Sequence, residues 1–144
     1  MQPDKIDWKI IKLLSDNYLS NNEIARHLKI SEGTVRRRIK ILQSEGIMRI
    51  KALLDPDVLE NQQLAIVAVS IAKAKLLDKK AQQISELKNV ISVSIVSGQY
   101  DLLVEVLVDS NKGLVRFLTE SLSTIEGITK TETFLILKSF GKFI

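Results

Sequence analysis

The chain has 144 residues, enough for one ordinary domain or two small ones, and its 45% hydrophobic and 26% charged residues are typical of a globular protein. It contains no cysteine, which excludes disulfides and thiolate metal sites and favours a reducing compartment. The formal net charge is +4, the longest apolar run is too short to span a membrane, and the N-terminus lacks the apolar segment of a signal peptide, so we expect a cytoplasmic protein without a membrane partner.

Three amphipathic helices are predicted in residues 1–45. Asp4 is a candidate N-cap for the first, and Ser20 with Glu23 matches the capping-box pattern S-x-x-E at the start of the second. The third begins after Ser31 and ends near Gly46, which suits the left-handed conformation that closes helices. Apolar residues recur at helical spacing in all three: Ile6, Ile10, Leu13 and Leu14; Ile24 and Leu28; Val35, Ile39 and Leu42. The short connection between the second and third helices predicts a helix-turn-helix.

The third helix contains the basic segment SEGTVRRRIK, residues 31–40. At roughly 100° per residue, its apolar stripe lies on one side, and Arg36, Arg37 and Lys40 lie on the other. Arg38 falls beside the stripe, where its head can contact either a phosphate or a neighbouring carboxylate. A solvated charged face is the simplest interpretation, but the second helix of such a motif normally enters the major groove of DNA.

We therefore predict double-stranded DNA as a partner and divide the candidate contacts into two groups. The candidates for groove contacts are Ser31, Glu32, Gly33, Thr34 and Arg37. The candidates for phosphate contacts are Arg36, Arg38 and Lys40, which would set affinity and salt dependence rather than sequence choice.

The chain changes character after the third helix. Residues 47–54 are predicted to be extended, and Asp55-Pro56 interrupts them. We divide the chain into a helix-turn-helix domain at 1–52, a linker at 53–63 with room for one helical turn, and a second domain at 64–144. Residues 1–52 carry 11 basic and 6 acidic residues, whereas 53–144 carry 10 and 11, so the first domain suits a polyanion and the second another task.

The second domain alternates between strand and helix patterns. Strands are predicted at 64–73, 90–97, 101–109 and 128–138, and helices at 76–88 and 111–127. This βαββαβ order predicts an α+β, ferredoxin-like fold with both helices on one face of a four-stranded antiparallel sheet. Only SGQYD separates the middle strands, which should form a hairpin.

Several motifs resemble the Lrp/AsnC family of leucine- and asparagine-responsive regulators. LSNNEIARHLKISEGTVRRRIKILQSEGIM resembles the family's helix-turn-helix signature, VSIVSGQYDLLVEVLVD its effector-domain hairpin, and IEGITKTETFLILK its closing strand. Asn61 departs from the family pattern, in which many members have a glycine after the linker. The order and spacing of these motifs extend over nearly the whole chain.

The resemblance implies a winged helix-turn-helix domain followed by a RAM/ACT-like effector and oligomerisation domain. It further implies a homodimer, often assembled into tetramers or octamers, and an amino-acid effector bound between subunits near the Gly-x-Tyr-Asp turn. The candidate effector contacts are Gly98, Gln99, Tyr100, Asp101, Thr131 and Thr133. A glycine turn can offer backbone N–H groups to the carboxylate of an amino acid, and Asp101 can bind its ammonium group. The same residues would also suit a plain hairpin turn with Gly98 in the αL region.

Two other functions compete with an effector-responsive transcription regulator. Sirohaem decarboxylases are similar to this family, but they need histidines around a tetrapyrrole, and the second domain here has none. A nucleoid-organising protein with little sequence preference differs only in degree. With one histidine, no cysteine and no phosphate-binding loop, the sequence predicts no enzyme activity, no cofactor and no metal site.

Overall fold

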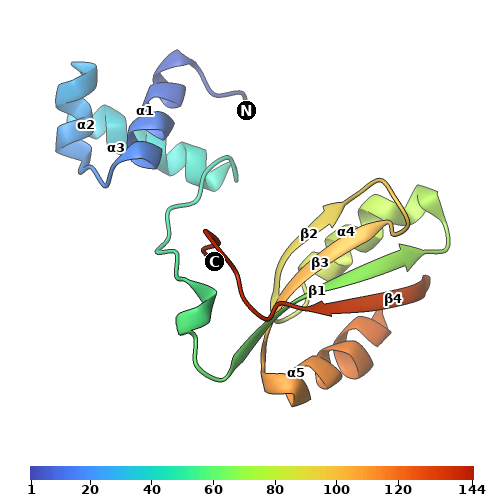
Figure 1. Cartoon of the computed structure of the whole chain (residues 1–144). Helices are drawn as coiled ribbons and strands as arrows, with labels where there is room; N and C mark the ends of the chain where they lie inside the picture. Colours follow the sequence, from blue (N-terminus) through green and yellow to red (C-terminus); the bar gives the residue numbers. More distant parts are fainter. The chain divides into compact units, whose positions relative to one another are not determined.

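The computed structural model describes all residues, 1–144, and separates them into two compact units, Met1–Ala52 and Leu53–Ile144. The N-terminal unit contains helices only, and the C-terminal unit contains a sheet with helices against it (Figure 1). None of the helices combines the length and apolar character needed to cross a membrane.

The N-terminal unit contains the three predicted helices: α1 (Lys5–Asp16), α2 (Asn21–Leu28) and α3 (Glu32–Ser44). Each begins at a predicted cap, because the side chains of Asp4, Ser20 and Ser31 accept hydrogen bonds from backbone N–H groups in the following turn. The apolar faces meet in one core whose buried members are Ile10, Ile24, Ala25, Val35 and Ile39. The predicted apolar stripes are thereby confirmed.

Two residues with positive φ mark the ends of elements here. Lys29 (φ 54°) closes α2 in the left-handed region and turns the chain toward α3. Gly46 (φ 68°) follows α3, as predicted. Residues 47–54, which the sequence predicts to be extended, form no strand. The backbone N–H groups of Ile47 and Met48 donate to the Leu42 carbonyl of α3, and Leu54 exchanges two backbone hydrogen bonds with Ile144.

The connection between the units contains one short 3₁₀ turn, Pro56–Val58, capped by the Asp55 side chain. Asn61, which replaces the family's frequent glycine, has φ 58°. Asparagine enters this left-handed region more readily than most residues, so the substitution keeps the turn available.

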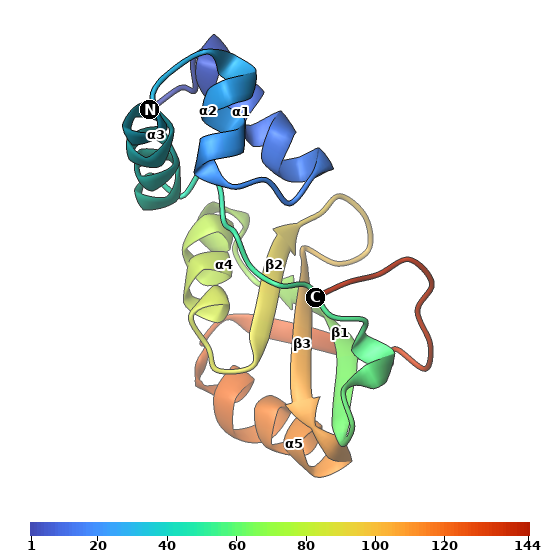
Figure 2. The ribbon, with the colours of Figure 1, turned by 90° about the vertical axis from the view of Figure 1, so that its left-hand side faces the viewer.

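The C-terminal unit has a four-stranded sheet: β1 (Gln62–Ile71), β2 (Val90–Ile95), β3 (Leu102–Asp109) and β4 (Ile128–Leu135). Its strand order is β2-β3-β1-β4, and every neighbouring pair is antiparallel. Figure 2 shows β2, β3 and β1 side by side. The predicted βαββαβ order and β2–β3 hairpin are confirmed.

Alternate residues of β1 and β3 form the core against α4 (Leu77–Ser85) and α5 (Ser110–Arg116). Val67, Val104 and Phe117 are among its buried members. The helix predicted at 111–127 is not one regular helix, because α5 passes into a π-helical segment, Phe117–Ser121, and then a 3₁₀ turn. The hydroxyls of Thr119, Ser123 and Thr124 donate to backbone carbonyls three or four residues earlier, and such bonds compete with the regular helical ladder.

Candidate DNA-binding surface and effector turn

The N-terminal end of α3 is held by a serine–threonine contact. Ser31 Oγ accepts a hydrogen bond from the Thr34 backbone N–H at 3.1 Å and lies 2.8 Å from Thr34 Oγ1. Both side chains remain exposed, and a Cβ added at Gly33 would meet no atom within 4 Å. The first turn of α3 is therefore open to a large ligand.

The middle of α3 divides into a buried and an exposed side. Val35 and Leu42 are fully buried, whereas Arg36, Arg37 and Lys40 are exposed. The Arg36 guanidinium lies 3.8 Å from the Glu32 carboxylate one turn earlier, a surface pair that leaves the side chain 70% exposed. The exposed cations lie together on the side of α3 opposite its apolar stripe.

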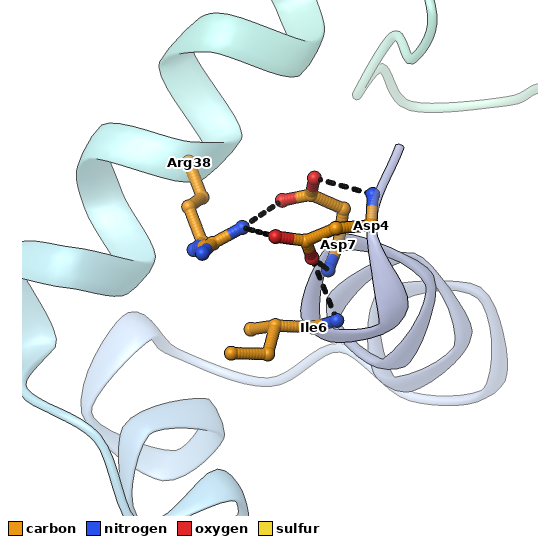
Figure 3. Close-up of polar contacts among 4 residues, drawn as sticks. All are labelled: Asp4, Ile6, Asp7 and Arg38. Atoms are coloured by element: carbon orange, nitrogen blue, oxygen red, sulfur yellow. Dashed lines mark hydrogen bonds and ion pairs between the residues drawn. The ribbon is translucent and has the colours of Figure 1, made fainter. Parts of the chain in front are cut away.

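Arg38 is not part of that exposed group. Its Nη1 atom donates to Asp4 Oδ2 at 2.7 Å and to Asp7 Oδ1 at 2.8 Å (Figure 3). Of the two partners that the sequence left open for this residue, a phosphate or a carboxylate, the structure contains the carboxylate. The contact joins α3 to the N-terminal end of α1.

The charges in this contact affect one another's protonation. The hydrogen bond from the Asp7 backbone N–H and then the Arg38 side chain lower the pKa of Asp4 below its ordinary value. The carboxylate of Asp7, followed by that of Asp4, raises the pKa of the Arg38 guanidinium. Both shifts favour the charged forms of Asp4 and Arg38.

Additional basic residues lie beside the turn of the helix-turn-helix. Asn22, Arg26, Lys29 and Glu32 border a shallow hollow between α2 and the start of α3. Arg26 and Lys29 are not among the contacts predicted from the sequence, although the signal for them was available: both are cations beside the turn of the helix-turn-helix. Both side chains are exposed and free to bind a phosphate.

The predicted effector turn connects β2 to β3. Gly98 has φ 139°, which is positive but outside the αL region expected for a plain turn, and Gln99 is exposed. The Asp101 backbone N–H donates to Val69 at 3.0 Å, and Asp101 Oδ2 accepts from the Ile71 N–H at 2.7 Å. One carboxylate oxygen of Asp101 is thus committed to the end of β1, which leaves Oδ1 for a further donor.

Tyr100 contacts β4 through two side chains that sequence analysis did not select. Its hydroxyl donates to Glu132, and Lys130 Nζ lies 5.3 Å from the centre of its ring. The hydrogen bond to the Glu132 carboxylate raises the pKa of the Tyr100 phenol. Tyr100 and Glu132 are 32 positions apart in the sequence, so no local pattern connects them.

Thr131 and Thr133 lie on the same strand as Glu132 but point to the other face of the sheet. They pair with Val69 and Val67, which belong to the core beneath the helices. Within one chain, the structure therefore places the two threonines on the helix-covered face and the Tyr100–Glu132 contact on the opposite face.

The geometry defines a class of protein: a helix-turn-helix unit with an exposed basic face, followed by a ferredoxin-like unit. Residues 64–142 match the family model described as Lrp/AsnC ligand binding domain, and residues 3–47 match the model described as winged helix-turn-helix DNA-binding. Because the first match extends over more than half of the chain, the protein belongs to the Lrp/AsnC family of transcriptional regulators.

Individual relatives agree with this assignment. The chain is 36% identical to an uncharacterized HTH-type transcriptional regulator of Pyrococcus furiosus, over 96% of this chain and 95% of the relative. It is 30% identical to the HTH-type transcriptional regulator Ptr1 of Methanocaldococcus jannaschii, over 95% and 93%. Among solved structures, a transcriptional regulator of Neisseria meningitidis in complex with L-methionine is similar, with a TM-score of 0.69, 26% identity and coverage of 98% and 94%.

Proposed function

We propose that the protein is a sequence-specific DNA-binding regulator that places the first turns of α3 in the major groove. The observation that carries this proposal is the division of α3, whose apolar stripe is buried while Arg36, Arg37 and Lys40 remain exposed on its other side. An exposed cationic face on the second helix of a helix-turn-helix unit suits a polyanion with a groove.

We propose that the groove contacts come from the open N-terminal turn of α3. Ser31, Glu32, Gly33 and Thr34 would lie closest to base edges, and Arg37 reaches outward from the same side. Arg36 and Lys40 would bind phosphates farther along the helix. Arg26 and Lys29 extend the phosphate-binding set to the turn between α2 and α3.

Binding to the protein's own promoter region tests this proposal. We expect tight, salt-sensitive binding to that fragment and weaker binding to random duplexes of equal length. A homodimer should require pseudo-palindromic half-sites about one helical turn, or a multiple, apart. The ratio of specific to non-specific affinity separates a sequence-specific regulator from a nucleoid-organising protein. Absence of binding at low salt would refute the proposal.

We propose that the C-terminal unit forms the homodimer and can assemble further into tetramers or octamers. The sheet face opposite α4 and α5 has no helix against it, and Phe134 on that face is 47% exposed. A second sheet would remove this apolar surface from water. Sedimentation at micromolar concentration tests the assembly, and a monomer would contradict it.

We also propose that an amino acid bound between subunits modulates the regulator. The similarity to a regulator crystallised with L-methionine supports this class of effector. In this proposal the turn of Gly98, Gln99 and Tyr100 contacts the effector, and Asp101 contacts it through Oδ1. The hydroxyls of Thr131 and Thr133 lie on the other face of the sheet, so they would reach the effector from a different subunit.

A thermal-shift screen of the twenty amino acids tests the effector proposal, because a ligand that binds only the folded state raises the melting temperature. An unshifted midpoint with all twenty would contradict it.

We propose that the protein regulates transcription in the cytoplasm without catalysing a reaction or holding a cofactor. In this fold no group of three or more potential metal ligands lies together.

A further inference from the structure

The ionic cluster of Arg38, Asp4 and Asp7 joins two helices of the N-terminal unit. Asp7 is the one charged residue that is buried in the chain, and the Arg38 side chain is 26% exposed. One nitrogen of Arg38 donates to both carboxylates, at 2.7 and 2.8 Å (Figure 3). The cluster thus connects the middle of α3 to the first turn of α1.

Each carboxylate has a second task at the end of α1. Asp4 Oδ1 accepts from the backbone N–H groups of Ile6 at 2.7 Å and Asp7 at 2.9 Å. Asp7 Oδ2 accepts from the Asp4 N–H at 2.9 Å. Each aspartate therefore uses one oxygen for the helix cap and the other for Arg38, which gives the guanidinium a firmly oriented pair of acceptors.

The direction of these hydrogen bonds complements the packing of α3. The apolar residues Val35 and Ile39 hold α3 on the core by a force that depends on buried area and only weakly on direction. Charge-assisted hydrogen bonds depend on direction and distance, so Arg38 restricts how α3 can rotate or slide against α1. Arg37, the next residue on α3, turns with the same helix.

We propose that Arg38 is a positioning residue for DNA recognition, which holds α3 against Asp4 and Asp7 so that Arg37 and Thr34 are presented to the groove. Arg38 itself does not bind a phosphate. If its guanidinium moved to DNA, the buried carboxylate of Asp7 would lose its cation, which is strongly unfavourable. This inference rests on the proposed DNA-binding function and assigns a role within it.

Two sets of substitutions break the cluster from opposite sides. Arg38→Met removes the cation while keeping an apolar stem. Asp4→Asn together with Asp7→Asn removes both negative charges but keeps side chains that can cap α1. The full-length protein, the two variants and their combination would be compared for affinity to a preferred and a random duplex at several salt concentrations.

We expect each variant to lower the ratio of specific to random affinity by about ten-fold, the scale of one lost base contact. The slope of log affinity against log salt should stay unchanged, and the combined variant should be no worse than either set alone. Lys40→Met is the matched control on the same helix, and it should reduce the salt slope while preserving the ratio.

A phosphate-binding Arg38 predicts the reverse pattern. Arg38→Met would then reduce the salt slope, and the double asparagine variant would keep or increase affinity because it releases the cation. Either result would overturn the positioning role, as would an unchanged specificity ratio. If Arg38→Met does not fold, Arg38→Lys serves instead, and it should retain part of the ratio because an ammonium can still reach one carboxylate.

The outcome separates this inference from the function on which it rests. A wild-type protein that prefers no duplex would refute both. A wild-type preference that survives in the folded variants would refute positioning alone. Thermal unfolding of the free proteins adds a readout without DNA, in which non-additive losses confirm that Arg38 and the aspartates act through one contact.

Discussion

The salt dependence of DNA binding follows from the exposed cations of the helix-turn-helix unit. Arg26, Lys29, Arg36 and Lys40 are all exposed there, and Arg38 is engaged by Asp4 and Asp7. A dimer that places these four cations of each subunit on phosphates would make about eight contacts, and at roughly 0.9 per contact log affinity should fall with log salt at a slope of about −7.

Lys40→Met removes one of these contacts from each subunit and should change the slope to about −5. Between 50 and 200 mM salt the wild type should lose about 10⁴-fold in affinity and the variant about ten-fold less. Fluorescence anisotropy with a labelled duplex at five salt concentrations measures both slopes. Lys79→Met, an exposed lysine on α4 in the other unit, is the control and should leave the slope unchanged.

Two results would refute this reasoning. A wild-type slope near zero would mean that the exposed cations do not meet phosphates. An equal change of slope in the Lys40 and Lys79 variants would mean that net charge, rather than the face of α3, governs binding.

Three further effects should follow from the same structure. Ser31→Ala removes the cap of α3 and should lower the free energy of unfolding by about 1 kcal/mol in urea titration, whereas Ser31→Asp should retain most of it; equal losses would contradict the cap. Phe117→Ala in the sheet core should lower it by about 3–5 kcal/mol, while Val115→Ala on the exposed side of α5 should change it little; similar losses would contradict the burial. The pKa of Asp4 is lowered from 3.8, mainly by the hydrogen bond from the Asp7 backbone N–H, and the pKa of Glu23 is lowered from 4.5, mainly by the Ser20 hydroxyl. Because both pKa values are lower in the folded state, their contribution to stability is present above these ordinary values and is lost as the pH falls below about 4.5. Circular dichroism against pH should show this loss, and it should shrink when both are replaced by their amides.

Much of the local structure could be predicted because its signals lie within one turn or one strand. The Ser20–Glu23 capping box needs residues only three positions apart, and the apolar spacing of Val35 and Ile39 marks the buried side of α3. Every second residue of β3 is buried in the structure, as the alternation of side chains along a strand requires. These patterns work because backbone geometry fixes the period at which neighbouring side chains meet.

The irregular part of the helix predicted at 111–127 could not be predicted from the spacing of apolar residues alone. Leu114, Phe117 and Leu122 carry an acceptable helical stripe, and they are buried as expected. In the π-helical segment the Thr119 hydroxyl donates to the Val115 carbonyl, a bond that competes with the regular helical ladder, and Phe117 is buried in the core. Spacing identifies which residues are buried but not how many residues each turn contains.

The sequence by itself determined the helix-turn-helix, its caps, its basic outer face and the βαββαβ order. The tertiary structure decided which charges remain available for ligands: Arg38 is engaged by aspartates 31 and 34 positions away, and Tyr100 by Glu132 on another strand. Ionic and hydrogen-bond partners so far apart in the sequence meet only because packing brings their side chains within hydrogen-bonding distance. The spacing of residues along one helix or strand does not show which of these side chains will meet. Helical phase placed Arg38 beside the core, but only the fold placed two carboxylates in front of it.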